Sequence, residues 1–143
     1  AEAGNRPVNR LFLSHNTLIN KGIRPAWFVR AWTDKLPAGT EIVTRNNLTV
    51  GFGLFTLLLP GDHRGNYMLP PGAIDPDKLE LAPAPDSWLR GRLSRAETLG
   101  GTELAPRAEF AFPAGTQPLS QPPVWTPGAF QGSGVAITRP AER

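Results

Sequence analysis

The stretch that decides the fold is residues 26–59, which read AWFVRAWTDKLPAGTEIVTRNNLTVGFGLFTLLL. Residues 26–32 alternate with a period of two and carry aromatic side chains on both faces, which predicts a strand that is covered on each side. Residues 36–40, LPAGT, are a turn signal with Pro in the second position, and residues 41–44 resume a strand. This order of strand, turn and strand is typical of a β-meander.

The apolar run at residues 48–59 follows a break at Asn46-Asn47 and predicts a core strand or a hairpin. It is shorter than the ~20 residues that a bilayer-spanning helix needs, and Gly51 and Gly53 interrupt it. The run therefore argues against a membrane span. We expect the aromatic side chains of this central region to be largely buried, namely Trp27, Trp32, Phe52 and Phe55.

Composition favours a β-rich fold over a helical bundle. The 143 residues fit one domain, and 16 Pro and 15 Gly interrupt the chain too often for long helices. With 40% hydrophobic and 19% charged residues, the chain can still bury a core. The sequence therefore predicts a mainly β protein, a small β-barrel or β-tulip-like domain with extended N- and C-terminal arms and at most one short helix.

Three regions follow from the pattern along the chain. Residues 1–25 are expected to form an N-terminal arm, which is anchored at a single point by the cluster Leu11-Phe12-Leu13. Residues 26–112 are expected to form the β-rich core domain, and residues 113–143 a Pro-rich extended C-terminal arm. The one helix candidate begins near Ser87 and has apolar residues at helical spacing, namely Leu89, Leu93 and Ala96.

The sequence contains no recognisable catalytic motif. The chain has no Cys and two histidines, His15 and His63, neither of which lies in a nucleophile motif. Asp62, Asp75 and Asp77 lack the spacing of a calcium loop, and no glycine-rich phosphate loop occurs. We therefore predict a protein that is not an enzyme, with no catalytic residues, no cofactor, no metal site and no small-molecule substrate.

The charge balance argues against direct nucleic-acid binding. The isoelectric point is near 10, yet 15 cations face 12 anions that are spread along the chain. One cluster leaves the alternative open, because Arg90, Arg92 and Arg95 follow Trp88 and could clamp phosphates or stack on bases. Twelve Arg against three Lys, with a single Met, fit a thermophilic source or a GC-rich genome.

The C-terminal arm holds two aromatic residues without a local core, Trp125 and Phe130. They either fold back or dock into another chain, and we favour docking because buried aromatics are strong interface anchors. The segment 134–138 could add a strand to the exposed sheet edge of another subunit. The candidate partner-binding residues are therefore Leu11, Phe12, Leu13, Trp125, Phe130, Val135 and Ile137.

The strand, LPAGT turn and strand of residues 27–44, followed by the small-residue run 49–59, resembles the head-decoration (cement) proteins of tailed bacteriophages, in particular those of phages that infect thermophilic bacteria. The resemblance spans about residues 1–60. It implies a homotrimer on the outer capsid surface of the virion, which stabilises the shell by bridging subunits of the major capsid protein. It carries over no catalytic residues.

The same LPAGT segment, residues 36–40, also resembles the SAF-type β-clip domain of sugar-acid and pilus-assembly proteins. This resemblance implies a ligand-binding module or a domain of a carbohydrate-active enzyme. The two hypotheses differ in a simple measurement: a stable trimer without small-molecule binding favours the decoration protein, and a monomer with a sugar-dependent thermal shift favours the β-clip module.

Overall fold

The computed structural model describes residues 9–112 and 114–132. Its regular elements are short strands and two 3₁₀ helices, η1 (Thr33–Lys35) and η2 (Pro76–Lys78). The first eight strands are β1 (Arg10–Ser14), β2 (Thr17–Ile19), β3 (Ala26–Trp27), β4 (Glu41–Arg45), β5 (Leu48–Val50), β6 (Gly53–Leu54), β7 (Asp62–Arg64) and β8 (Tyr67–Leu69). The last four are β9 (Thr98–Leu99), β10 (Thr102–Glu103), β11 (Ala108–Phe110) and β12 (Thr116–Pro118).

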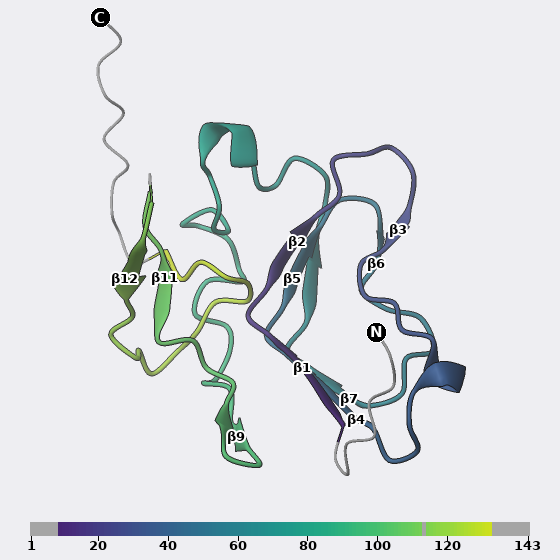
Figure 1. Cartoon of the computed structure of the whole chain (residues 1–143). Coiled ribbons are helices and arrows are strands. Elements are labelled where there is room, and N and C mark those ends of the chain that lie inside the picture. Colours follow the sequence, from purple (N-terminus) through teal and green to yellow (C-terminus); the bar gives the residue numbers. More distant parts are fainter. Residues whose placement is uncertain (1–8, 113, 133–143) are drawn as a thin grey trace, which may run out of the picture.

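The first eight strands form a stack of parallel coils. β1, β4 and β7 pair in parallel, β2, β5 and β8 do the same, and β3 pairs with β6. The chain therefore winds through β1, β2 and β3 as a first coil, through β4, β5 and β6 as a second, and through β7 and β8 as a third (Figure 1). Each coil lies on the next, which is the arrangement of a β-solenoid.

A repeated corner explains why the coils stack in register. Between its first two strands, each coil turns through one residue with positive φ, at 54° for His15, 55° for Asn46 and 69° for Gly65. Asn and Gly tolerate this left-handed backbone better than most residues. In each coil the next residue is an asparagine, so the corners read His15-Asn16, Asn46-Asn47 and Gly65-Asn66.

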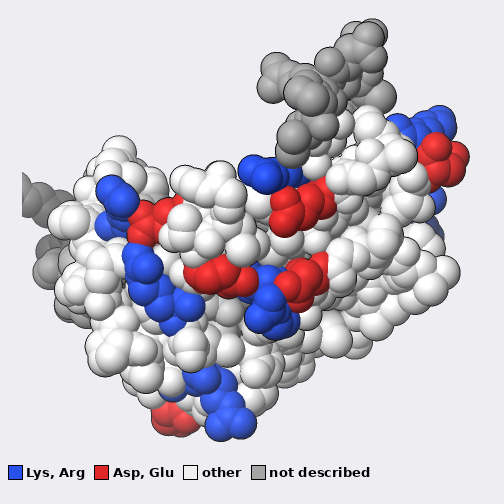
Figure 2. Space-filling view, turned by 90° about the horizontal axis from the view of Figure 1, so that it is seen from below, with Lys and Arg blue, Asp and Glu red and all other residues white. Residues whose placement is uncertain are grey.

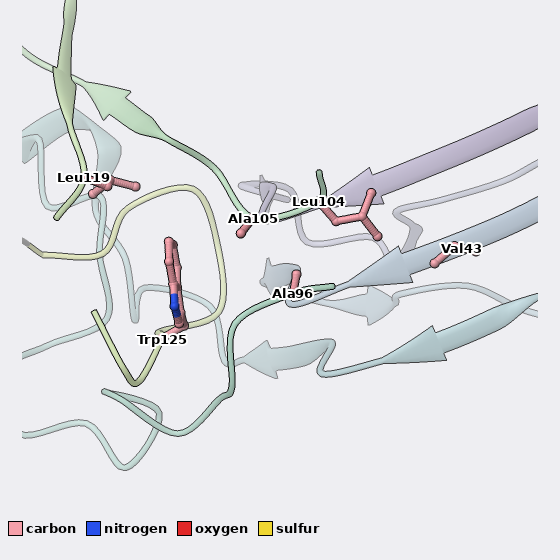
Figure 3. Close-up of a cluster of buried hydrophobic side chains, with 6 residues drawn as sticks. All are labelled: Val43, Ala96, Leu104, Ala105, Leu119 and Trp125. Atoms are coloured by element: carbon pink, nitrogen blue, oxygen red, sulfur yellow. The ribbon is translucent and has the colours of Figure 1, made fainter. Parts of the chain in front are cut away.

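The second half of the chain packs against the outer side of the stack. Strands β9 and β10 form one hairpin and β11 and β12 another, and Figure 1 shows them beside the stacked strands. A buried cluster joins the two halves (Figure 3). Phe12 of β1 packs against this cluster. Its members are Val43, Ala96, Leu104, Ala105, Leu119 and Trp125. Leu48 and Val50 of β5 form a second buried cluster with Ile74 and Leu89.

The mainly β prediction is confirmed, but its finer form is wrong. The described strands do not close into a barrel, because they pair in parallel between coils in sheets of two or three strands. For the same reason β4, β5 and β6 do not form a meander. The helix expected after Ser87 is absent, since residues 88–91 form turns and Gly91 has a φ of 61°.

Both predicted arms differ from the structure. Within the expected N-terminal arm, residues 10–19 supply β1 and β2, which pair with β4 and β5 along their whole length. Within the expected C-terminal arm, Trp125 is 0% exposed and exchanges two backbone hydrogen bonds with Leu93. The described parts of both segments are therefore not extended arms, because they bury apolar side chains in the same molecule.

The burial predicted for the central aromatics is wrong for three of the four. Trp27 is 49% exposed, Trp32 56% and Phe52 52%, whereas Phe55 is half-buried. The strand expected over residues 26–32 is reduced to the two residues of β3, of which Trp27 is exposed. Among the described residues, no helix has the length and apolar character needed to cross a membrane.

Candidate functional site at the open end of the first coil

The first coil leaves a cavity of about 300 Å³ at its end of the stack. Leu11 and Leu13 of β1 point into it, whereas Phe12 between them points to the cluster around Trp125. This alternation follows from the period of two in a strand. The other lining residues are Asn16, Leu18, Phe28, Val29, Arg30, Asn47 and Phe55.

The cavity lies at the end of the interior of the stack, where no described segment covers the first coil. Leu11 lies in register with Ile42, and Leu13 with Thr44, and both residues of the second coil are at most 3% exposed. Leu18 lies in the same way over the fully buried Thr49. The second coil therefore forms the floor of the cavity, and the first coil has nothing equivalent on its other side among the described residues.

Asparagine side chains connect the corners of the three coils. Oδ1 of Asn47 accepts from the backbone N–H and from Nδ2 of Asn16, both at 2.9 Å. Oδ1 of Asn66 accepts the same two bonds from Asn47, at 3.2 and 2.8 Å. We call this series the asparagine ladder. It ends at the cavity rim, where Oδ1 of Asn16 has no hydrogen-bond donor among the described residues.

Beside the same cavity, β1 has an edge that pairs with no strand in the described part of the chain. Glu41 donates its N–H to the carbonyl of Asn9, and His15 donates to Arg45, so odd-numbered residues face β4. In a parallel pair the alternate residues point their N–H and C=O groups to the opposite side. The backbone groups of Arg10, Phe12 and Ser14 therefore face away from β4, and no strand in the described part of the chain pairs with them.

An exposed cation borders the cavity. The guanidinium of Arg30 lies 5.1 Å from the ring centre of Trp27 and 4.7 Å from that of Trp32. Such cation–π contacts fix the position of a long side chain at a surface. The rim therefore combines an exposed aromatic pair, one positive charge and the terminal amide of the ladder.

Both histidines make contacts within the protein that connect separate segments of the fold. His15 is buried at the first corner, packs edge-on against Trp125 and contacts the carbonyl of Gly128 through Nδ1, while its Nε2 faces the amide of Asn46. Burial lowers the pKa of His15 to about 4, so it is neutral at pH 7. His63 contacts Thr44 and the carbonyl of Leu59. In the described ranges, no three His, Cys, Asp or Glu side chains converge in the manner of metal ligands.

An ion cluster centred on the buried Arg45 connects the second coil to the third and to the second half of the chain. The side chain of Arg45 is 3% exposed and contacts Asp62 at 2.6 Å and Glu97 at 2.7 Å. Arg64 also pairs with Asp62. Hydrogen bonds from Arg64 and Arg45 hold the pKa of Asp62 below its ordinary value, and Arg45 lowers the pKa of Glu97. These charges neutralise one another within the protein.

The arginines of the basic cluster also have partners within the chain. Arg90 donates to the carbonyl of Gln131 at 2.9 Å, Arg92 lies over Trp88, and Arg95 pairs with Glu103. Figure 2 shows cations and anions interleaved on the face seen from below, with no broad field of one sign there. On that face the distribution differs from the basic patch or stripe that is typical of nucleic-acid-binding proteins.

The structure separates the residues that the sequence grouped as partner-binding. Leu11 and Leu13 line the cavity, Phe12 packs inward, Trp125 is buried in its own core and Phe130 is half-buried. Docking of Trp125 into another chain is therefore wrong. Val135 and Ile137 lie outside the described residues. Asn16 and Asn47 were missed, although an asparagine before each apolar segment was the available signal.

Comparisons with family models, with curated proteins and with solved structures found no match for this chain.

Proposed function

We propose that this chain is a structural protein that binds a protein partner through the open end of its first coil and catalyses no reaction. One observation carries the proposal: an apolar cavity and a strand edge that no described strand pairs with lie together on a coil whose other side is covered by the second coil. Burying an exposed apolar surface favours binding of a partner, and the exposed edge of a strand can form backbone hydrogen bonds with a strand of that partner. A strand from another polypeptide satisfies both.

The resemblance of residues 1–60 to head-decoration proteins gives this proposal its specific form. The chain forms trimers on the outside of a viral shell and bridges subunits of the major capsid protein. The open end replaces the C-terminal tail as the contact surface, because Leu11 and Leu13 are accessible there and Trp125 is not. A thermophilic source remains part of this proposal.

Cosedimentation with heads of a tailed bacteriophage from which decoration protein has been stripped tests the proposal. The wild-type chain is expected to bind, and Leu13→Asp is expected to weaken binding roughly tenfold or more, because it places a charge in the apolar cavity. Leu58→Asp is the matched control, since Leu58 is 91% exposed and is not one of the residues that line the cavity. Equal binding by both variants, or no binding by the wild-type chain, contradicts the proposal.

The cavity also favours a second candidate, the SAF-like ligand-binding module. Its volume is at the lower end of small-molecule sites, and Asn16, Arg30 and Asn47 bring polar groups to an apolar lining. A monomer by light scattering whose thermal midpoint rises with an added sugar acid supports this function. A trimer without such a shift supports the structural one.

A further inference from the structure

We propose that the cover of the open end is a further coil of parallel strands, supplied by a partner polypeptide that places a left-handed residue and an asparagine directly over His15 and Asn16. This inference rests on the proposed partner binding and adds the shape and the register of the bound segment. Three features of the first coil lead to it.

The asparagine ladder specifies the corner of the covering segment. Within the chain, each Oδ1 of Asn47 and Asn66 accepts one backbone N–H and one Nδ2–H from the coil before it. Oδ1 of Asn16 is the next acceptor in the series and has no donor in the described part of the chain. An asparagine at the same corner of a covering coil supplies both donors. A small apolar ligand supplies neither.

The strand edge specifies direction and register. β1 and β4 pair in parallel over five residues, from Arg10 with Glu41 to Ser14 with Arg45. The outward N–H and C=O groups of β1 have the same spacing as the groups of β4 that bond to β1. A further parallel strand can therefore pair with β1 in the same register. With the corner asparagine fixed over Asn16, the strand before it lies over β1.

The cavity specifies the side chains. Leu11, Leu13 and Leu18 face it, and in the second coil the register partners of these residues are buried beneath them. A covering coil therefore needs apolar side chains at alternate positions, directly above these three leucines. It closes the cavity in the same way that the first coil closes the second.

A full coil is longer than residues 1–8, because the shortest spacing between successive corners, from Asn47 to Asn66, is 19 residues. Residues 1–8 alone are therefore too few to make it, and this inference assigns the covering coil to the partner of the proposed function.

A tandem duplication of residues 10–40 tests the inference without any shell. The 31-residue unit matches the spacing between the Cα partners Arg10 and Glu41, so the added copy enters the stack in register. We expect the thermal midpoint to rise by roughly several degrees and the outward amides of the inner β1 to become protected from hydrogen exchange by roughly tenfold or more. The matched control carries Asn16→Ala in the outer copy only, and most of both gains should be lost.

An unchanged thermal midpoint with unprotected amides overturns the inference, and so do gains that are the same with and without the outer asparagine. Should the tandem chain fail to fold, a synthetic peptide of residues 41–50, EIVTRNNLTV, serves as the probe on the intact protein. It should slow exchange at the amide of Phe12, and the Asn47→Ala peptide should not. No slowing with either peptide contradicts the inference. Shell binding that depends on Leu13 would still stand in that case, so the two failures can be told apart.

Discussion

The first and second coils have the same corner geometry and lie in register, but they differ in burial. Residues 42–50 of the second coil are all buried, whereas residues 11–14 of the first coil are only partly buried. Leu11 and its register partner Ile42 are both apolar, so residue type does not explain the difference. In a stack, burial depends on whether a coil has neighbours on both sides. The first coil has one neighbour among the described residues, and this places the candidate binding surface.

Among these predictions, disrupting the contact between the coils and the second half of the chain should lower the free energy of unfolding the most. Trp125 is fully buried in the cluster that covers β1 and β4, so Trp125→Ala should lower the free energy of unfolding by about 3–5 kcal/mol. Trp32→Ala is the control, because the 56% exposed Trp32 should change it by less than about 0.5 kcal/mol. Chemical denaturation measures both, and similar values for the two would contradict the packing of Trp125.

The difference between the coils can be measured on one register pair. Ile42→Ala should destabilise the protein by about 2–5 kcal/mol, because it opens a cavity in a sealed interior. Leu11→Ala removes a half-buried side chain that already faces a cavity, and should cost about 1 kcal/mol. Urea unfolding of the two variants is the test. Equal losses would mean that the first coil is as well covered as the second.

Acid should loosen the first corner. The pKa of His15 is lowered to about 4 in the folded protein, while an unfolded histidine has a pKa near ~6.5. Between these values the unfolded chain binds more protons, so stability falls as the pH drops through this window, by up to about 3 kcal/mol. His15→Asn should remove this part of the pH dependence, since Asn46 occupies the equivalent left-handed position in the second coil. An identical pH profile for the variant would contradict burial of His15.

The asparagine ladder should be stronger in its middle than at its end. Asn47 connects Leu13, Asn16 and Asn66 through its side chain, so Asn47→Ala should cost about 1–3 kcal/mol by leaving buried groups without partners. Asn16→Ala should cost less, about 0.5–1.5 kcal/mol, because its Oδ1 has no donor among the described residues. Denaturation midpoints compare them. A larger loss at Asn16 would reverse the expected order.

Local pattern predicted several strands and could not predict their partners. The strand expected at residues 41–44 is β4. Alternation shows that Trp27 and Phe28 face opposite sides, but not which side another segment covers. The burial of Trp125 depends on a contact with residues far away in the sequence, which no local pattern contains.

The stack itself had a sequence signal that unequal spacing obscured. The segments SHNTLI, RNNLTV and RGNYML, at residues 14–19, 45–50 and 64–69, all place an asparagine before the second strand of a coil. Successive corners are 31 and then 19 residues apart, because the loop after the first coil is longer. A search for a fixed period therefore misses them, although the corner chemistry is the same each time.

Amide hydrogen exchange on the isolated chain at low concentration compares the two coils at a single register pair, Phe12 and Val43. The N–H of Phe12 faces away from β4 and should exchange with little protection, whereas the N–H of Val43 lies on the central strand and should exchange only as the protein unfolds globally. This result would establish that the edge of the first coil is free to receive another strand. Equal, strong protection at Phe12 and Val43 would contradict it.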